Sequence, residues 1–365
     1  MTTSVIRGMG VCLPERIVTN DDLARQLQTS DSWIRSRTGI RFRRWADPGT
    51  STGDLATAAG VAALNSANTD ADFVVLATTT PDRPCPATGP EVARRIGLTD
   101  VPAVDIAAVC SGFIYGLTMA ASLISSGVCS RPLVIGAEVY SSIIDPEDRQ
   151  TAVIFGDGAG AVLLQQGSIE QPGAIQAINL GSDGSRSDFI EIAAGGSRNP
   201  HRDGMTTRKD RYFRMQGRRV FAQAVQRMTS SCHLTLERVH WSPASIGVFI
   251  SHQANQRIID AVGDRLGIDP HRRFGNIADV GNTAAASLPL AMAATADRQL
   301  AEPGARTLLT AFGGGLTWGS VALNWPDVRP IYRSASRQDR APDPSHAAGT
   351  PLMPATMPGA VSPLT

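Results

Sequence analysis

Residues Asp105–Ser122 have the sequence DIAAVCSGFIYGLTMAAS, and this stretch decides the fold. Ile106–Ile124 carries no charge, so by length alone it is a candidate membrane span. However, a strand pattern at Ala103–Val109 precedes a helical pattern, and Ser111 and Gly116 interrupt the apolar run. We therefore expect a buried strand followed by a buried helix in a soluble chain, with no membrane span.

The same order of elements recurs in the second half of the chain. Asn276–Thr295 echoes the opening stretch, and short apolar strands are predicted before and after each copy. These strands are 72–76 (DFVVL) and 131–135 (RPLVI) in the first half, and 246–250 (IGVFI) and 306–310 (RTLLT) in the second. Strands that alternate with helices at this spacing predict parallel sheets with helices on both faces. The sequence therefore predicts an α/β fold of two duplicated halves, 1–170 and 171–326.

Two segments need separate interpretation. The glycine run Phe155–Gly160 resembles a dinucleotide-binding motif, but a strand pattern (Ala161–Gln165) follows it instead of a helix, so we expect a tight turn. From Asp327 to Thr365 the chain holds seven prolines and no apolar periodicity. Such a segment buries too little surface to offset its ordering entropy, which predicts a disordered tail.

Composition limits the classes of function. The 365 residues are 42% hydrophobic and only 18% charged, with a net charge of +1. The low charge predicts a surface partly covered by a partner subunit, and the charge balance argues against a general nucleic-acid binder. The five cysteines are far apart and no CxxC pair exists, so neither a disulfide framework nor a metal site is expected. Met1–Gly10 has no apolar signal segment, and we expect a reducing, cytoplasmic compartment.

Three polar residues stand where open α/β sheets place their functional sites, at the carboxyl ends of strands. Cys110 lies where a predicted strand gives way to a helix, and the helix N-terminus is expected to lower the pKa of its thiol. His252 directly follows strand 246–250, and Asn282 lies in the second half's counterpart of the Cys110 elbow. Taken singly, a cysteine is usually a core residue and a loop asparagine a turn former. The duplication is expected to bring them together, which favours a catalytic site.

A glycine-rich turn follows strand 306–310. In Phe312–Gly315, three successive glycines leave the backbone N–H groups open to a ligand, as an oxyanion hole requires. A plain turn between strands is the alternative.

Six motifs together make the chain resemble the β-ketoacyl-acyl-carrier-protein synthase III family of the thiolase superfamily. The resemblance runs from about Ser4 to Trp325. Its motifs are TSDSWIRSRTGI (29–40), DIAAVCSGF (105–113), IFGDGAGA (154–161), SHQANQRI (251–258), VGNTAAAS (280–287) and AFGGGLTWGS (311–320). The resemblance implies a thiolase-like homodimer in which two α/β halves form a five-layered αβαβα core. It implies an acyltransferase that uses acyl-CoA and a malonyl-acyl-carrier protein and needs no cofactor.

The resemblance also implies roles for the residues of the site. Cys110 would accept the acyl group, with the backbone N–H groups of Cys110 and Gly314 as the oxyanion hole. His252 and Asn282 would donate hydrogen bonds to the malonyl thioester during decarboxylation. Trp33, Arg37 and Arg149 would bind the nucleotide of CoA, and Gly217 and Asn255 would line the pantetheine tunnel.

The chain departs from the family pattern in two places. Cys85 stands where well-known members have an aromatic at the end of the primer pocket, which predicts a starter bulkier than acetyl. Ala222 and Asp264 stand where the carrier-protein docking face often carries lysines. Docking would then rest on Arg218, Arg219 and Arg257. These departures favour an enzyme dedicated to one pathway, for example in secondary metabolism.

Two alternatives stay open at this point. In the first, the acyl group on Cys110 passes to a hydroxyl or amine of a small natural product. That chemistry would gain from an acidic residue in place of Asn282, to aid His252 as a base. In the second, the chain is a non-catalytic binding or scaffold protein on an inherited fold, and the intact triad argues against it.

Overall fold

A computed structural model describes residues 2–201 and 206–335 of the chain. Its larger sheet has six strands in the order β14-β1-β7-β6-β4-β5. β4 runs parallel to both β5 and β6, whereas β7 is antiparallel to β6 and to β1. The strands are β1 (Thr2–Cys12), β4 (Phe73–Ala77), β5 (Ala103–Ile106), β6 (Pro132–Glu138), β7 (Gly158–Ser168) and β14 (Ile331–Tyr332).

The second sheet has four strands in the order β11-β12-β13-β8. β11 and β12 are parallel, and β13 is antiparallel to both of its neighbours. The strands are β8 (Ile175–Ser182), β11 (Val248–Ser251), β12 (Arg306–Gly313) and β13 (Thr317–Asn324). Two short pairs, β2 (Ile17–Thr19) with β3 (Phe42–Arg44) and β9 (Ile190–Glu191) with β10 (Arg214–Met215), lie outside the two sheets.

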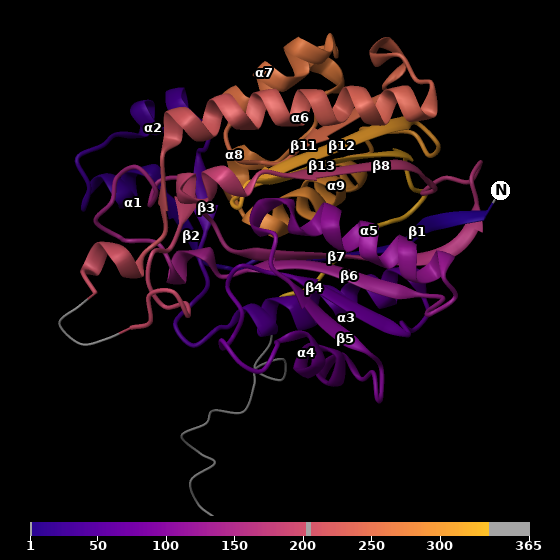
Figure 1. The fold of residues 1–365 in the computed structure, drawn as a ribbon, viewed down its shortest axis with the longest axis horizontal. Coiled ribbons are helices and arrows are strands. Elements are labelled where there is room, and N and C mark those ends of the chain that lie inside the picture. Colours follow the sequence, from indigo (N-terminus) through magenta and orange to yellow (C-terminus); the bar gives the residue numbers. More distant parts are fainter. Residues whose placement is uncertain (1, 202–205, 336–365) are drawn as a thin grey trace, which may run out of the picture.

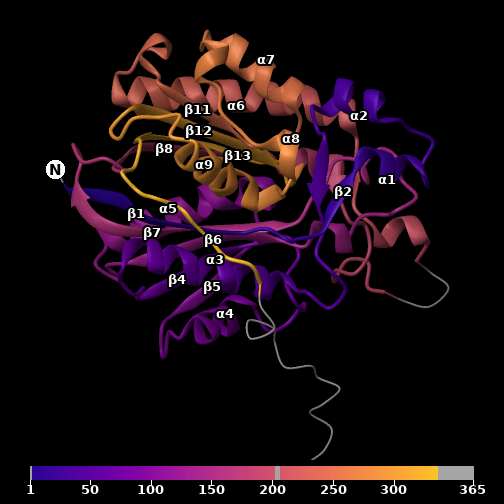
Figure 2. The same cartoon turned by 180° about the vertical axis from the view of Figure 1, so that it is seen from behind.

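Helices cover both sheets and also lie between them, as Figures 1 and 2 show. α6 and α7 cover the outer face of the second sheet, α3 and α4 cover the outer face of the first, and α5 and α9 fill the middle layer. The order of layers is therefore αβαβα, and the predicted thiolase-like fold class is confirmed. The helices are α1 (Asn20–Ala24), α2 (Asp31–Thr38), α3 (Thr52–Ala67), α4 (Gly89–Ile96), α5 (Gly112–Ser125), α6 (Gly217–Val239), α7 (Gln256–Leu266), α8 (Ile277–Val280) and α9 (Ser287–Asp297).

Glycines let the middle layer approach the first sheet closely. A Cβ at Gly116 of α5 would lie 2.9 Å from a methyl group of Val134, and one at Gly160 of β7 would lie 2.8 Å from Pro289 of α9. Gly158 and Gly160 lie inside β7, so the expectation that the whole run Phe155–Gly160 is a turn is wrong. Gly158 and Gly160 leave room for α9 to pack closely against β7. The prediction that a strand and not a helix follows the glycine run is correct.

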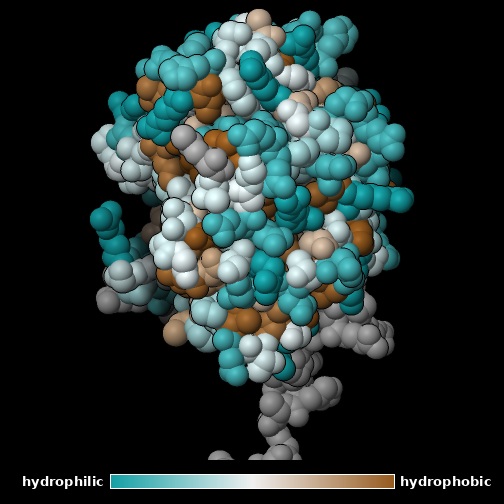
Figure 3. Space-filling view, turned by 90° about the vertical axis from the view of Figure 1, so that its right-hand side faces the viewer, coloured by the Kyte–Doolittle hydropathy of each residue, from teal (hydrophilic) through white to brown (hydrophobic). Residues whose placement is uncertain are grey.

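The apolar stretch at Ile106–Ile124 is a strand end followed by a helix with one buried face, as expected, whereas the strand itself is half-buried and not buried. β5 ends at Ile106 and not at Val109, because the chain turns there into the 3₁₀ turn η1 (Val109–Ser111). In the described part of the chain, no helix combines the length and the apolar character that crossing a bilayer requires. The end of the molecule seen in Figure 3 carries mostly polar side chains with apolar patches between them.

Each half contains one turn that begins with a left-handed backbone conformation. Val109 of η1 has a φ of 46°, and Ala284, which begins the turn η7 (Ala284–Ala286), has a φ of 44°. Residues other than glycine rarely adopt this left-handed region. Each turn leads directly into a middle-layer helix, α5 or α9. This repeated backbone feature supports the duplication inferred from the sequence.

The start of the tail differs from the expectation of disorder from Asp327. The structure describes the chain as far as Ala335 and places β14 parallel to β1, with Gly10 opposite Ile331. The Ser66 hydroxyl also donates to the carbonyl oxygen of Arg329 at 2.7 Å. A two-residue strand that pairs with the distant N-terminus leaves no local periodicity, so the sequence pattern gave no sign of it. The predicted disorder of 336–365 concerns residues outside the described ranges.

Candidate active site

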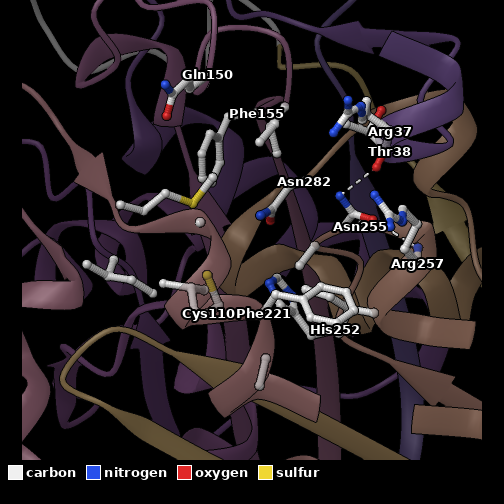
Figure 4. Close-up of a pocket in the computed structure, with 18 of the residues that line it drawn as sticks. Arg37, Thr38, Cys110, Gln150, Phe155, Phe221, His252, Asn255, Arg257 and Asn282 are labelled. Atoms are coloured by element: carbon white, nitrogen blue, oxygen red, sulfur yellow. Dashed lines mark hydrogen bonds between the residues drawn. The ribbon is translucent and has the colours of Figure 1, made fainter. Parts of the chain in front are cut away.

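The turn η1 places Cys110 between β5 and α5, where its side chain is buried with 8% exposure. The left-handed Val109 makes the chain reverse sharply, so that the sulfur points into a cavity (Figure 4). The turn is held from two sides: the Ser111 hydroxyl lies 2.9 Å from the carbonyl oxygen of Ala108 and 2.8 Å from the hydroxyl of Thr317 in β13. These contacts therefore hold Cys110, the candidate nucleophile, in a fixed position.

The protonation state of Cys110 differs from the expectation. Burial raises the pKa of the Cys110 thiol well above its ordinary value, and the nearby carboxylate of Glu138 raises it further. The prediction that this pKa is lowered is wrong, because removal of the thiolate from water is the largest effect on it. Cys110 is therefore a neutral thiol at physiological pH.

His252 follows the end of β11 and is almost fully buried. Its backbone N–H donates to the carbonyl oxygen of Thr310 in the neighbouring strand, at 2.7 Å. Burial lowers the pKa of the imidazole to about 3, so the ring is neutral at physiological pH. Its Nδ1 lies 2.5 Å from the hydroxyl oxygen of Ser287, at the start of α9. When Ser287 donates to Nδ1, the proton of the neutral ring is on Nε2 and can be donated to a ligand.

Asn282 is fixed in orientation by its own hydrogen bonds. Its Oδ1 accepts from the backbone N–H of Ala284 at 2.9 Å, and its backbone N–H donates to the carbonyl oxygen of Ile154. Because the amide oxygen is engaged, the NH₂ group is the end of this side chain that can donate toward the cavity. Two neutral donors, one from each of two segments, therefore face the space beside Cys110 (Figure 4).

The three residues share one cavity of about 520 Å³. Its lining is mostly apolar, with four phenylalanines among the aliphatic side chains, which suits an acyl chain. Tyr140 supports this lining from behind: its ring stacks on Phe155 with the centroids 4.3 Å apart and meets the edge of Phe213 at 5.3 Å. The apolar lining residues, apart from Trp33 at the mouth, are Val153, Ile154, Phe155, Ile190, Phe213, Met215, Val220, Phe221, Ala224, Met228, Ala254, Ile258 and Phe312.

The glycine turn after β12 lies against the cysteine elbow. A Cβ at Gly313 would lie 2.8 Å from the backbone nitrogen of Cys110, so only glycine fits there. Gly314 follows, is buried, and accepts a hydrogen bond at its carbonyl oxygen from Thr317. Gly313 was not singled out from the sequence, although the three-glycine motif contained it. The role of the Gly314 N–H as an oxyanion donor stays a prediction.

Arginines and a tryptophan gather at the mouth of the cavity. Trp33 and Arg37, both from α2, line it, and the guanidinium groups of Arg37 and Arg149 lie 5.6 and 5.0 Å from the centroid of the Trp33 ring. Arg149 itself does not line the cavity; it also donates to the carbonyl oxygen of Gln28 at 2.7 Å. A flat aromatic face beside two cations suits a nucleotide with phosphates.

The remaining predicted residues divide between the cavity and the surface. Gly217, at the start of α6, lines the cavity and has open space where a side chain would be. Asn255 caps α7 and donates to the carbonyl oxygen of Arg37 at 2.9 Å, which joins two walls of the mouth. Arg218 and Arg257 are exposed lining residues, whereas Arg219 lies outside the lining and packs over Phe189. Their docking role stays a prediction.

Cys85 lies apart from this cavity. It is exposed on the loop between β4 and α4, and it is absent from the lining of the cavity that holds Cys110. Its place at the end of a primer pocket stays a prediction.

Sequence reasoning missed two supporting hydroxyls, Ser287 on the imidazole and Thr317 on the elbow. Both lie inside quoted motifs, five residues after Asn282 and two after Gly315. Their roles depend on contacts between elements, which the local pattern does not reveal.

Comparisons with known proteins agree with this geometry. A family profile described as 3-oxoacyl-[acyl-carrier-protein] synthase III matches residues 104–184, and its C-terminal counterpart matches residues 236–325. The chain is 57% identical over 328 residues to β-ketoacyl-[acyl-carrier-protein] synthase III 5 of Streptomyces coelicolor, covering 90% of this chain and 98% of that protein.

Two solved structures support the fold. The 3-oxoacyl-(acyl carrier protein) synthase III of Pseudomonas aeruginosa superimposes with a TM-score of 0.84 at 46% identity, covering 90% of this chain and all of the other. A priming β-ketosynthase from a polyketide biosynthetic pathway has a TM-score of 0.83 at 31% identity, with 89% and 97% of the two chains covered. The chain therefore belongs to the β-ketoacyl-acyl-carrier-protein synthase III family of condensing acyltransferases.

Proposed function

We propose that this enzyme loads an acyl group from acyl-CoA onto Cys110 and condenses it with malonyl-acyl-carrier protein, which primes a fatty-acid or polyketide chain. The observation that carries the proposal is the shared cavity, in which the thiol of Cys110 faces two fixed neutral donors, His252 and Asn282. Every step uses only these side chains, the backbone and the substrates, so the reaction as proposed needs no cofactor.

The first half-reaction is transacylation. The sulfur of Cys110 attacks the thioester carbon of acyl-CoA, the bond between that carbon and the CoA sulfur breaks, and the Cys110 proton ends on CoA as a free thiol. The carbonyl oxygen carries negative charge in the tetrahedral state. The backbone N–H of Cys110 and that of Gly314 are the donors assigned to it, and removing one such donor typically costs about 3–4 kcal/mol.

The second half-reaction is decarboxylative condensation. The malonyl carboxylate leaves as carbon dioxide, and its electron pair moves onto the thioester, whose oxygen becomes an enolate. Nε2–H of His252 and the NH₂ group of Asn282 donate to that oxygen. The enolate carbon then attacks the acyl carbon on Cys110, and the cysteine sulfur leaves as a thiolate that takes up a proton from water. A β-ketoacyl-carrier protein is released.

The mouth of the cavity supports the assignment of substrates. Trp33, Arg37 and Arg149 are assigned to the nucleotide of CoA, and Gly217 and Asn255 to the pantetheine arm. The carrier protein, an acidic partner in this proposal, would dock on the exposed arginines 218, 219 and 257. We further propose a cytoplasmic homodimer in which Cys85 of each subunit closes the other's primer pocket, and a starter bulkier than acetyl.

Transfer of the acyl group to a hydroxyl or amine is not favoured. The relatives at 48–57% identity are named as β-ketoacyl-carrier-protein synthases, and Asn282 is a neutral donor suited to an enolate. In the transfer reading, the acyl-enzyme would be discharged by a small alcohol or amine and not by the malonyl donor.

Intact-protein mass spectrometry tests the proposal. The enzyme is incubated with a panel of acyl-CoAs, and the mass increment identifies the starter; malonyl-carrier protein is then added and should return the enzyme to its free mass. Cys110→Ala should show no increment yet still decarboxylate the malonyl donor slowly. His252→Ala and Asn282→Ala should load normally and fail to decarboxylate.

Cys232→Ala is the matched control. Cys232 is a buried cysteine of α6 that does not line the cavity, and burial raises the pKa of its thiol to about 12. Its variant should load and discharge like the wild type. Acylation of Cys110→Ala at the wild-type rate would remove Cys110 from the nucleophile role.

A further inference from the structure

Arg43 of β3 is a buried arginine that the proposed reaction does not use. Its side chain has no exposed surface, and burial lowers the pKa of the guanidinium only to about 10, so the group stays charged at physiological pH. Nη2 donates to Oδ1 of Asn20 and to the carbonyl oxygen of Val153, each at 2.8 Å, and Nη1 donates to the carbonyl oxygen of Val18 at 3.2 Å. Removal of a charge from water costs free energy, and none of these neutral acceptors offsets that cost with an opposite charge. The arginine is therefore better explained by the segments that it joins than by a gain in stability.

Asn20, the first residue of α1, extends this connection to α2. It is 1% exposed, and its NH₂ group donates to Oδ1 of Asp31 at 2.8 Å and to the carbonyl oxygen of Ile40 at 2.9 Å. Asp31 is the first residue of α2 and Ile40 lies just beyond its end, so one amide group holds both ends of this helix. Figure 1 shows α1 and α2 beside β2 and β3 at one end of the molecule. Because α2 carries Trp33 and Arg37, the connection reaches the mouth of the cavity.

The other end of the connection is a fixed part of the cavity wall. Val153 lines the cavity together with the next two residues, Ile154 and Phe155. The backbone of Asn282 holds this segment: its N–H donates to the carbonyl oxygen of Ile154 at 2.9 Å, and its carbonyl oxygen accepts from the N–H of Gly156 at 3.0 Å. These two bonds do not involve the arginine, so the wall keeps its position without it. The arginine and Asn20 transmit that position to α2.

We propose that Asn20 and Arg43 are positioning residues that fix α2 against the cavity wall, so that the side chains of α2 meet the nucleotide of CoA. The inference rests on the function proposed above, in which Trp33 and Arg37 bind that nucleotide. Pantetheine enters the same tunnel but lacks the nucleotide, and so does the arm of a carrier protein. The connection should therefore matter for CoA and not for pantetheine or malonyl-carrier protein.

Two variants break the connection at different points. Asn20→Asp keeps the shape of the side chain and the acceptor for Arg43, but it has no NH₂ group to donate to Asp31 or Ile40. Arg43→Met keeps an unbranched apolar stem and loses every donor, so the bonds to Asn20 and to the wall are both lost.

Two further variants serve as controls. Trp33→Ala removes the aromatic face itself and measures how much the nucleotide contributes to binding. Asn179→Asp is the matched control, because it also places a carboxylate at a buried asparagine. Asn179 of β8 is 8% exposed, accepts from the Ser231 hydroxyl at 2.9 Å and is absent from the lining of the cavity that holds Cys110.

The first measurement is calorimetric binding of two probes, CoA and pantetheine. Loss of one hydrogen bond typically changes affinity about tenfold, so we expect Asn20→Asp and Arg43→Met each to bind CoA at least about tenfold more weakly than the wild type. Both should bind pantetheine as the wild type does, and Asn179→Asp should bind both probes normally. General damage to the fold would weaken both probes equally, and that result would overturn the proposal. Wild-type affinity for CoA in either variant would remove that residue from the role.

The second measurement is acylation of Cys110 by butyryl-CoA, followed by intact mass at several substrate concentrations. The concentration for half-maximal loading should rise at least about tenfold in both variants while the maximal rate stays unchanged, as expected when binding alone is lost. Decarboxylation of malonyl-carrier protein should stay at the wild-type rate. A lower maximal rate with unchanged half-saturation would contradict the proposal.

A variant nearer the surface provides the test if the two buried substitutions do not fold. The Asp31 side chain is 37% exposed, and Asp31→Ala removes the acceptor of Asn20 from the α2 side. Arg35→Ala is its control, because Nε of Arg35 donates to the same oxygen of Asp31 at 2.8 Å. We expect only Asp31→Ala to weaken CoA binding, and equal affinities of the two variants would overturn the proposal.

Failure of the proposed function would look different from failure of this inference. A wild-type enzyme that does not bind CoA would overturn the proposed function, and the inference with it. If Trp33→Ala weakens CoA binding and the variants of Asn20 and Arg43 do not, the nucleotide site stands and this inference alone is overturned.

Discussion

Ser287→Ala should separate the two half-reactions through a residue that touches neither substrate. The Ser287 hydroxyl lies 2.5 Å from Nδ1 of His252, and burial keeps the imidazole neutral with a pKa of about 3. A neutral ring has one proton, and only a donor at Nδ1 places that proton on Nε2. Loss of this hydrogen bond costs about 1–1.5 kcal/mol, which corresponds to a fall of about tenfold in decarboxylation. Removing the imidazole itself should cost about 3–4 kcal/mol, or several hundredfold.

The assay is decarboxylation of malonyl-carrier protein, with acyl loading of Cys110 as the internal control. Loading should be unchanged, because Ser287 contacts the imidazole and not the thiol. Since the imidazole protonates only near pH 3, the decarboxylation rate should show no inflection from His252 between pH 5 and 8. The reasoning is refuted if Ser287→Ala retains the full wild-type rate, or if it falls as far as His252→Ala.

Three further predictions concern the pocket, the core and the tail. Cys85→Phe should shift the starter preference toward acetyl-CoA, because each methylene excluded from a buried pocket is worth about 0.8 kcal/mol; an unchanged profile in the acyl-CoA panel would show that Cys85 lines no pocket. Tyr140→Phe should raise the free energy of unfolding by about 1–3 kcal/mol, since its buried hydroxyl has no hydrogen-bond partner among the described residues; a destabilised variant in urea titrations would contradict this. Deletion of residues 336–365 should leave the melting temperature unchanged, whereas deletion from Asp327 should lower it by several degrees, because it removes β14 and the bond from Ser66 to Arg329. Equal melting temperatures for both truncations would show that β14 contributes nothing.

The fold and the reactive residues were predictable because their signals are local. Cys110, His252 and Asn282 each stand in a short motif near a strand or turn that the apolar pattern marks, and the echo between the halves predicts that they meet. The pKa of Cys110 was not predictable in the same way. Its direction depends on burial and on Glu138, which approaches from another strand, and neither is visible in the residues around the cysteine.

Two other features could not be predicted from the sequence, because they also depend on contacts between distant segments. β14 is two residues long and gains its hydrogen bonds from β1, at the opposite end of the chain, so composition alone suggested disorder. The role of Ser287 depends on how α9 packs against β11, which brings a helix start to the imidazole. In each case the deciding contact joins segments far apart in the sequence.

The paired left-handed turns at Val109 and Ala284 indicate a division of labour between the two copies of one ancestral unit. The first copy carries the reactive thiol at the centre of its turn. The second has alanine at the corresponding place, Ala285. A duplicated protein needs only one nucleophile, so the second turn is free for another task, and its Ala284 N–H holds the amide oxygen of Asn282. Substitutions in this second turn should therefore change the donor side of the site and leave the turn that carries the nucleophile intact.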